Sequence, residues 1–289
     1  MDERWCRHID KVHIVDNTLT NCWLTPAAAF SLREKASIAR MLDFIGVDII
    51  EAGIPGMNEK ERASVLHINS LGLRARIVTW NRISLGDIRA SLACGVKDIY
   101  LSAPVSDLLI RYKTGNTRQW VLDCTKRVLR YAGDYGCSVS VGAEDASRAD
   151  IEFVEELALL AQEMGAKRFR FADTAGVLEP VEVLERLIRL GEKLKIELEF
   201  QGCDVSGKAA ANSVVAVKAG VRYISTVVGL PGERAGSTDL KRFIGMLKLI
   251  LGYYPDLRFN MINKLERYVA RATSRNLREN VDLYRTGNA

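Results

Sequence analysis

The feature of this sequence that most constrains its fold is a unit that recurs along most of its length. In each copy, a stretch of helical periodicity ends at a glycine, and a short β-rich run follows directly. Glycine is favoured there because the residue that closes a helix often takes a left-handed conformation, which a Cβ atom disfavours. The runs behind Gly46, Gly72, Gly95, Gly136, Gly165 and Gly220 are residues 47–51, 73–80, 96–101, 137–141, 167–171 and 221–226.

These units predict a closed parallel barrel. Residues 32–44, 151–164 and 181–194 carry apolar side chains at helical spacing between the runs. Alternating helices and strands are typical of βαβ units. Further strands over residues 12–16 and 196–200 bring the expected number to about eight, which favours a (β/α)₈ barrel for a 289-residue chain. No Gly-x-Gly-x-x-Gly motif follows the first strand, which disfavours a dinucleotide-binding fold.

The same patterns predict one domain. We expect the α/β barrel to span residues 1–255 and a short C-terminal helical extension to span residues 256–289. The 41 Lys and Arg are dispersed among 36 Asp and Glu, which argues against a nucleic-acid partner. No apolar run approaches the ~20 residues of a membrane span. The six cysteines form no Cys-x-x-Cys pair, so we expect a soluble, cytoplasmic protein from a reducing compartment.

Functional side chains of such barrels lie where the strands end and the loops begin. Polar or glycine-rich segments follow nearly every predicted strand. These segments are residues 16–18, 51–53, 80–82, 102–104, 142–145, 173–174, 201–204 and 229–237. They predict a polar site at one end of the barrel.

Several of these segments resemble the homocitrate synthase and isopropylmalate synthase family, and most closely the homocitrate synthases linked to nitrogen fixation. The resemblance implies a (β/α)₈ barrel, a homodimer and a Claisen-type condensation. In that reaction acetyl-CoA supplies a carbon nucleophile that attacks the keto group of a 2-oxo acid held on a divalent metal. The residues that carry the resemblance are 15–19, 49–55, 104–108, 141–150, 171–176, 211–213 and 229–236.

The chain departs from the family pattern at the residues that carry this chemistry. Where the family has a catalytic Arg and a metal-ligating Asp, this chain has Thr20 and Asn21. The family's His-x-His pair corresponds to Gln201 and Cys203, and a further Asn ligand corresponds to Ser237. Divalent ions depend on anionic and strongly donating ligands. We therefore expect no tightly held metal or other cofactor.

Other positions at the predicted mouth remain candidates. Glu144 lies in an intact family motif near the substrate, and Thr174 resembles a contact to a substrate carboxylate; these are the candidate catalytic residues. Each also has a structural interpretation, because Glu144 and Asp145 could pair with Arg148 or Arg170 and Thr174 could cap a turn. The candidate substrate-binding residues are Asp16, Asn21, Arg82, Ser106, Gln201, Cys203, Asp204 and Ser237.

Three further features of the mouth leave alternatives open. Cys22 and Cys203 could bind a soft metal with Asp204 or form a redox pair, although separated cysteines are more often unpaired thiols. Lys208 could form a Schiff base, although a solvated lysine is the more frequent case. The glycine-rich turn before Ser237 could bind an anion or serve only as a turn.

The sequence as a whole predicts a diverged barrel that acts by binding. We expect it to be inactive in the condensation and to bind a small carboxylate or 2-oxo acid or serve as a partner subunit. Its expected assembly is a homodimer or a hetero-oligomer with an active synthase. The alternatives are an active acyltransferase of the family type and a metal-free lyase or aldolase.

Overall fold

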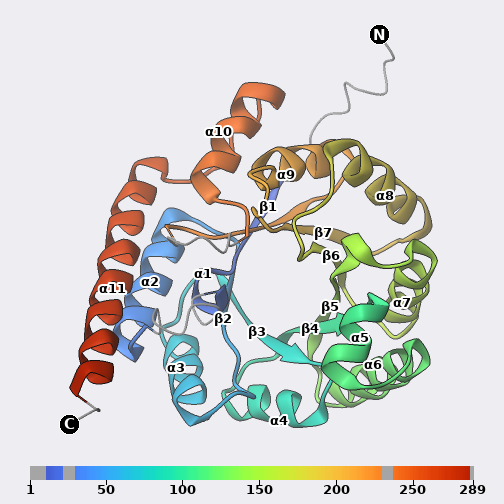
Figure 1. The fold of residues 1–289 in the computed structure, drawn as a ribbon, viewed down its shortest axis with the longest axis horizontal. Coiled ribbons are helices and arrows are strands. Elements are labelled where there is room, and N and C mark those ends of the chain that lie inside the picture. The colour runs from blue at the N-terminus through green and yellow to red at the C-terminus, as the bar shows by residue number, and fades with distance from the viewer. Residues whose placement is uncertain (1–10, 22–29, 230–236, 287–289) are drawn as a thin grey trace.

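Eight parallel strands close into a barrel in chain order, with the last strand paired to the first (Figure 1). The computed structural model describes residues 11–21, 30–229 and 237–286. This confirms the predicted (β/α)₈ barrel. The strands are β1 (His13–Asp16), β2 (Ile49–Gly53), β3 (Arg76–Arg82), β4 (Asp98–Pro104), β5 (Ser138–Glu144), β6 (Arg168–Asp173), β7 (Glu197–Gly202) and β8 (Tyr223–Thr226).

Helices surround the barrel as an outer ring (Figure 1). The last helix, α11 (Phe259–Thr286), lies alongside α2. The others in chain order are α1 (Thr18–Asn21), α2 (Leu32–Ile45), α3 (Glu59–Asn69), α4 (Leu85–Ala93), α5 (Asp107–Thr114), α6 (Arg118–Asp134), η4 (Ala146–Arg148), α7 (Ile151–Glu163), α8 (Pro180–Lys193), α9 (Ala209–Lys218) and α10 (Leu240–Leu251). No helix in these described ranges has the length and apolar character needed to cross a membrane.

Local signals place the helix ends. Ser31 and Glu34 form a reciprocal capping box at the start of α2, and Gly46 ends that helix with φ 104°. Most strands begin and end one to three residues later than the apolar runs suggest; β3, for example, spans Arg76–Arg82. Strand limits differ because they depend on pairing with neighbouring strands, which the local sequence does not encode.

The core has two parts. Between the strands and the helix ring, aliphatic side chains form one large buried cluster. Inside the barrel, Val15, Ile49, Val78 and Tyr100 form a second, smaller apolar cluster. The remaining space inside the barrel holds charged side chains from β2, β6 and β7 rather than a further apolar layer, and these lead to the site.

Candidate functional site

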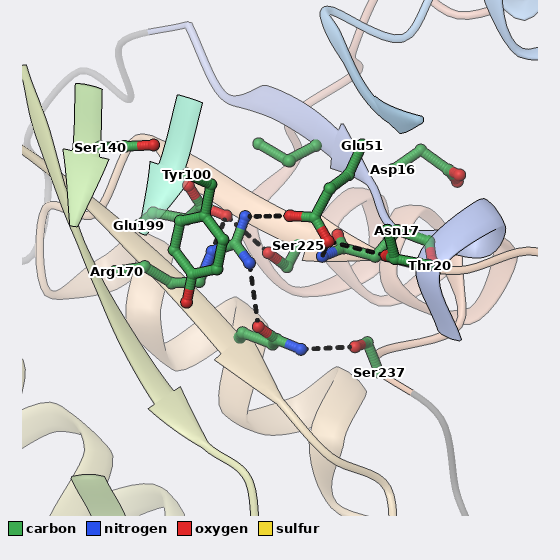
Figure 2. Close-up of polar contacts among 12 residues, drawn as sticks. Asp16, Asn17, Thr20, Glu51, Tyr100, Ser140, Arg170, Glu199, Ser225 and Ser237 are labelled. Atoms are coloured by element: carbon green, nitrogen blue, oxygen red, sulfur yellow. Dashed lines mark hydrogen bonds and ion pairs between the residues drawn. The ribbon is translucent and has the colours of Figure 1, made fainter. Parts of the chain in front are cut away.

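A buried guanidinium occupies the middle of the barrel. Arg170 of β6 is only 1% exposed. Its Nη2 donates to Oε2 of Glu51 on β2 at 3.0 Å, and its Nε lies 2.6 Å from Oε1 of Glu199 on β7 (Figure 2). Parallel pairing sets Arg170 directly beside Glu199. The cation is therefore balanced by two carboxylates that come from opposite parts of the sequence.

The Glu199 carboxylate has further partners deeper in the barrel. Arg168, two residues before Arg170 on β6, donates from Nε to Glu199 Oε2 at 2.6 Å. Ser225 of β8 donates its hydroxyl to Glu199 Oε1 at 2.6 Å. Side chains two residues apart on a strand face the same way, so Arg168 and Arg170 both point inward.

An aromatic ring covers the guanidinium. The Arg170 Cζ lies 3.6 Å from the centroid of the Tyr100 ring of β4, a cation–π contact. The phenol lies against the backbone of β5 at Gly142, where an added Cβ would be 2.0 Å from the Tyr100 oxygen. Gly142 is thus required for space, since no side chain fits between the two strands at that point.

Hydrogen bonds connect this centre to the mouth. Arg170 Nη1 donates to Gln201 Oε1 at 3.2 Å, and Gln201 Nε2 donates to Ser237 Oγ at 3.0 Å. On the opposite side, Thr20 Oγ1 donates to Glu51 Oε1 at 2.7 Å. Thr20, Gln201 and Ser237, at which the resemblance implies a departure from the family, therefore belong to one network around Arg170 (Figure 2).

The charges of this network are mutually stabilised. Burial alone would raise the pKa of Glu199, but the guanidiniums of Arg170 and Arg168 hold it below its ordinary value. Burial likewise opposes the charge on Arg170, yet the Glu199 carboxylate raises its pKa. The pKa of the Tyr100 phenol is raised, chiefly by burial. Arg170 and Glu199 are therefore both ionised near neutral pH.

Asp16 lies at the end of β1 and is fully buried. One carboxylate oxygen accepts the backbone N–H of Thr18 at 2.9 Å, which is the turn-capping role that Asp often fills. The other oxygen, Oδ2, has no hydrogen-bond partner among the residues that the structure describes. Burial raises the pKa of Asp16 to about 7, so this group titrates near neutral pH.

Glu144 and Asp145 end β5 with different partners. Glu144 receives hydrogen bonds from Lys113 at 2.6 Å and from Ser102 at 3.3 Å, rather than pairing with either arginine considered from the sequence. Asp145 forms an ion pair with Arg148, whose Nη2 donates to Asp145 Oδ2 at 2.8 Å. Asp145 also has a left-handed backbone, with φ 66°.

Ser106 and Thr174 both contact Asp145. Ser106 donates its hydroxyl to Asp145 Oδ2 at 2.5 Å. The Thr174 hydroxyl accepts the Asp145 backbone N–H at 3.0 Å and so holds the adjacent loop, where the sequence suggested a turn cap. These two side chains thus stabilise the loop that positions Glu144 at the mouth.

The remaining mouth residues lie around the rim. Arg82 pairs with Asp87 at 2.8 Å, and Lys208 pairs with Glu179. Asp204 accepts the backbone N–H of Ala209 at 2.9 Å at the start of α9. Arg82 and Lys208 are therefore each paired with a carboxylate, and Asp204 caps the start of α9.

Cys203 lies beside Ser237, with which it forms an isolated backbone bridge. Burial and the charges of Asp173 and Asp204 raise the pKa of its thiol to about 12. Cys22 and the side chain of Asn21 lie outside the described residues. Within the described part of the chain, no group of three or more His, Cys, Asp or Glu is arranged to hold a metal ion.

Sequence reasoning missed the central role of Arg170, Glu199 and Tyr100. A signal was present, because the segments Arg168-Phe169-Arg170-Phe171 and Glu197-Leu198-Glu199-Phe200 alternate charged and apolar residues. Strands of a parallel barrel are ordinarily continuous apolar runs. Charge at every second position therefore marks a polar layer inside the barrel.

The fold and the mouth define a (β/α)₈ barrel whose polar groups gather at the strand ends. Comparison with known proteins agrees with this class. The HMGL-like family model matches residues 11–269. The 2-isopropylmalate synthase 2 of Caldanaerobacter subterraneus subsp. tengcongensis is 40% identical over 266 residues, which are 92% of this chain and 69% of that protein.

Two further comparisons agree, one in sequence and one in fold alone. The homocitrate synthase subunit alpha of Clostridium pasteurianum is 39% identical over 241 residues, covering 83% of this chain and 90% of that protein. The solved structure of an HMG-CoA lyase from Brucella melitensis has a TM-score of 0.78 at 16% identity, with 92% of this chain and 99% of that chain covered. The chain belongs to the HMGL-like family and is a homocitrate and isopropylmalate synthase-like barrel.

Proposed function

We propose that this chain does not catalyse the family's condensation and acts by binding, either to a small carboxylate or 2-oxo acid or as a partner subunit of an active synthase. The observation that carries the proposal is the network of Thr20, Gln201 and Ser237 around Arg170. Residues that the family uses to bind metal and stabilise an enolate here bind other side chains.

The donors at these positions do not suit a divalent metal. Gln201 offers only a neutral amide oxygen, and that oxygen already accepts from Arg170. The Cys203 thiol, with a pKa of about 12, is protonated near neutral pH, whereas metals bind the thiolate. The buried cation of Arg170 is an additional repulsive charge. In other enzymes, loss of one oxyanion donor alone costs about 2.7–4 kcal/mol of barrier lowering.

The partner-subunit version has support from one relative. The Clostridium pasteurianum protein is described as subunit alpha of a homocitrate synthase, and this chain covers 90% of it. A barrel of this length can therefore be one component of an enzyme. By the same likeness, we propose a homodimer or a hetero-oligomer with an active synthase as the working form.

The experiment measures release of CoA from acetyl-CoA in the presence of 2-oxoglutarate and Mg²⁺ or Mn²⁺. The native chain is expected to release no CoA above the protein-free rate, and metal analysis to find no stoichiometric divalent ion. The matched variant restores the family residues at five positions and is expected to gain metal binding. These substitutions are Thr20→Arg, Asn21→Asp, Gln201→His, Cys203→His and Ser237→Asn. Metal-dependent CoA release by the native chain would refute the proposal.

Binding is tested separately. Thermal-shift measurements with 2-oxo acids and homocitrate at millimolar concentration are expected to raise the melting temperature, because a ligand that binds only the folded state stabilises it. Mixing with an active synthase tests the subunit version by size-exclusion chromatography. A chain that neither responds to a carboxylate nor co-elutes with a synthase does not act by binding as proposed.

A further inference from the structure

One cavity among the described residues lies on the outside of the barrel, in the ring of helices. It is a groove of about 570 Å³ lined by α6 and by Leu85 at the start of α4. The two helices are neighbours in the outer ring (Figure 1). We call it the α4–α6 groove. Its volume lies within the range of ~300–1,000 Å³ that small-molecule sites occupy.

Three exposed cations form the middle of the groove wall. Lys126, Arg127 and Arg130 lie on one face of α6, because they are spaced by one, three and four residues. Two carboxylates, Asp123 and Asp134, line the groove from positions on either side of these cations in α6. Asp123 accepts a hydrogen bond from Gln119 at 3.0 Å.

These three cations have no carboxylate partner in the described part of the chain. No carboxylate oxygen of the described chain lies within 4.0 Å of their charged nitrogens, and Arg127 donates only to the Cys124 sulfur at 3.3 Å. Two other exposed arginines differ, since Arg118 at the start of α6 and Arg189 on α8 each bridge two carboxylates. Like charges on adjacent turns of a helix repel, so this cluster is unfavourable without an anion.

The floor of the groove is apolar. Leu85 lines it from α4, and the ring of Tyr131 lines it from α6. A fourth cation, Arg89, lies over that ring with its Cζ 5.7 Å from the centroid. The lining residues therefore carry three cations and two carboxylates, and Arg89 adds a fourth cation at the Tyr131 ring.

We propose that the α4–α6 groove binds an organic diphosphate of the nucleoside diphosphate type. The two phosphate groups contact the three α6 cations, and the organic portion lies against Leu85 and the edge of Tyr131. Arginine suits this role because its planar donors match phosphate oxygens in pairs. Asp134 is placed to accept hydrogen bonds from hydroxyl groups of the ligand. The site is independent of the barrel mouth and of the function proposed for it.

The test is isothermal titration calorimetry of the full chain with ADP, at low and at physiological salt. Saturable one-site binding that weakens with salt is expected, because the contacts are ionic and exposed. The double variant Arg127→Ala with Arg130→Ala is expected to weaken ADP binding at least about tenfold, or 1.4 kcal/mol. The matched control is Arg40→Ala, which removes an exposed cation of α2. Its ADP affinity should equal that of the native chain.

Further titrations locate and define the ligand. Inorganic pyrophosphate is expected to bind more weakly than ADP, and adenosine not to bind. Millimolar 2-oxoglutarate should leave ADP binding unchanged.

Absence of saturation at millimolar ADP, or equal affinity of the double variant and the native chain, would overturn the proposal. Tighter binding of single-stranded RNA than of ADP would also overturn it, in favour of a nucleic-acid surface. A urea midpoint checks that the double variant is folded. If the double variant is unfolded, the single variant Lys126→Ala takes its place in the titrations.

Discussion

Removing the guanidinium at the barrel centre should cost a large part of the stability of this protein. Arg170→Met keeps much of the side-chain volume but deletes the contacts to Glu51 at 3.0 Å and to Glu199 at 2.6 Å. Glu199 keeps Arg168 as a partner, whereas the donors left to Glu51 among the described residues are neutral, as Thr20 is. A buried charge that loses its partner typically costs about 3–5 kcal/mol, and we expect that range here.

Urea unfolding followed by circular dichroism measures this loss. With a slope of about 3 kcal/mol/M, the midpoint should fall by at least about 1 M at pH 7. The matched control is Arg242→Met, whose side chain is 69% exposed and approaches Asp204 at 3.6 Å. An exposed pair of this kind contributes roughly 0–1 kcal/mol, so its midpoint should change little.

Two additional measurements test the electrostatic cause. The Glu199 pKa is lowered in the folded state, so the stabilisation from its ion pairs is fully present above the unfolded value of 4.5 and is lost as the pH falls through the folded pKa. The difference in the free energy of unfolding between the native chain and the variant should therefore decrease at acidic pH. Adding Glu51→Gln to Arg170→Met should recover part of the loss. A loss below about 1 kcal/mol, or one independent of pH, would refute the reasoning.

Three other predictions concern single residues. Burial raises the pKa of Asp16 from 3.8 to about 7, so between these pH values the folded state holds a proton that the unfolded state releases. The free energy of unfolding should therefore fall by up to about 4 kcal/mol between pH 4 and 7. The urea midpoint of Asp16→Asn should lack this decline, and an equal decline in the variant would contradict the prediction. Gly142→Ala should destabilise by about 1–3 kcal/mol through its clash with Tyr100, whereas Gly133→Ala, with open space, should be neutral or stabilising in the same urea assay. Cys203, with only about one thiolate in ten thousand at pH 8, should resist iodoacetamide in mass spectrometry, and rapid alkylation would disprove its raised pKa.

Much of the fold was predictable because its signals are local. A glycine such as Gly46 ends a helix by its own backbone conformation, without a tertiary partner. Helical periodicity likewise identifies the buried face of a segment before the segment that packs against it is known. The strand ends were less predictable, as in β3, because their limits depend on pairing with β2 and β4. The position of the mouth followed from the barrel itself, since all parallel strands end on the same side.

The site was predictable only in part. The resemblance identified Thr20, Gln201 and Ser237 as changed positions, but not the contacts that they form. The pairing of Asp145 with Arg148 was foreseeable, because the two are three residues apart. That of Glu144 with Lys113 was not, because α5 brings the lysine from another part of the chain.

The sequence by itself thus determined the barrel and its mouth, because caps, periodicity and strand-end composition act over short distances. Only the tertiary structure decided which charges meet. Arg170 and Glu51 are 119 residues apart and come together inside the closed sheet. Their pairing depends on the closure and register of all eight strands. Closure also removes the pair from water, and the lower dielectric constant strengthens the attraction between the two charges.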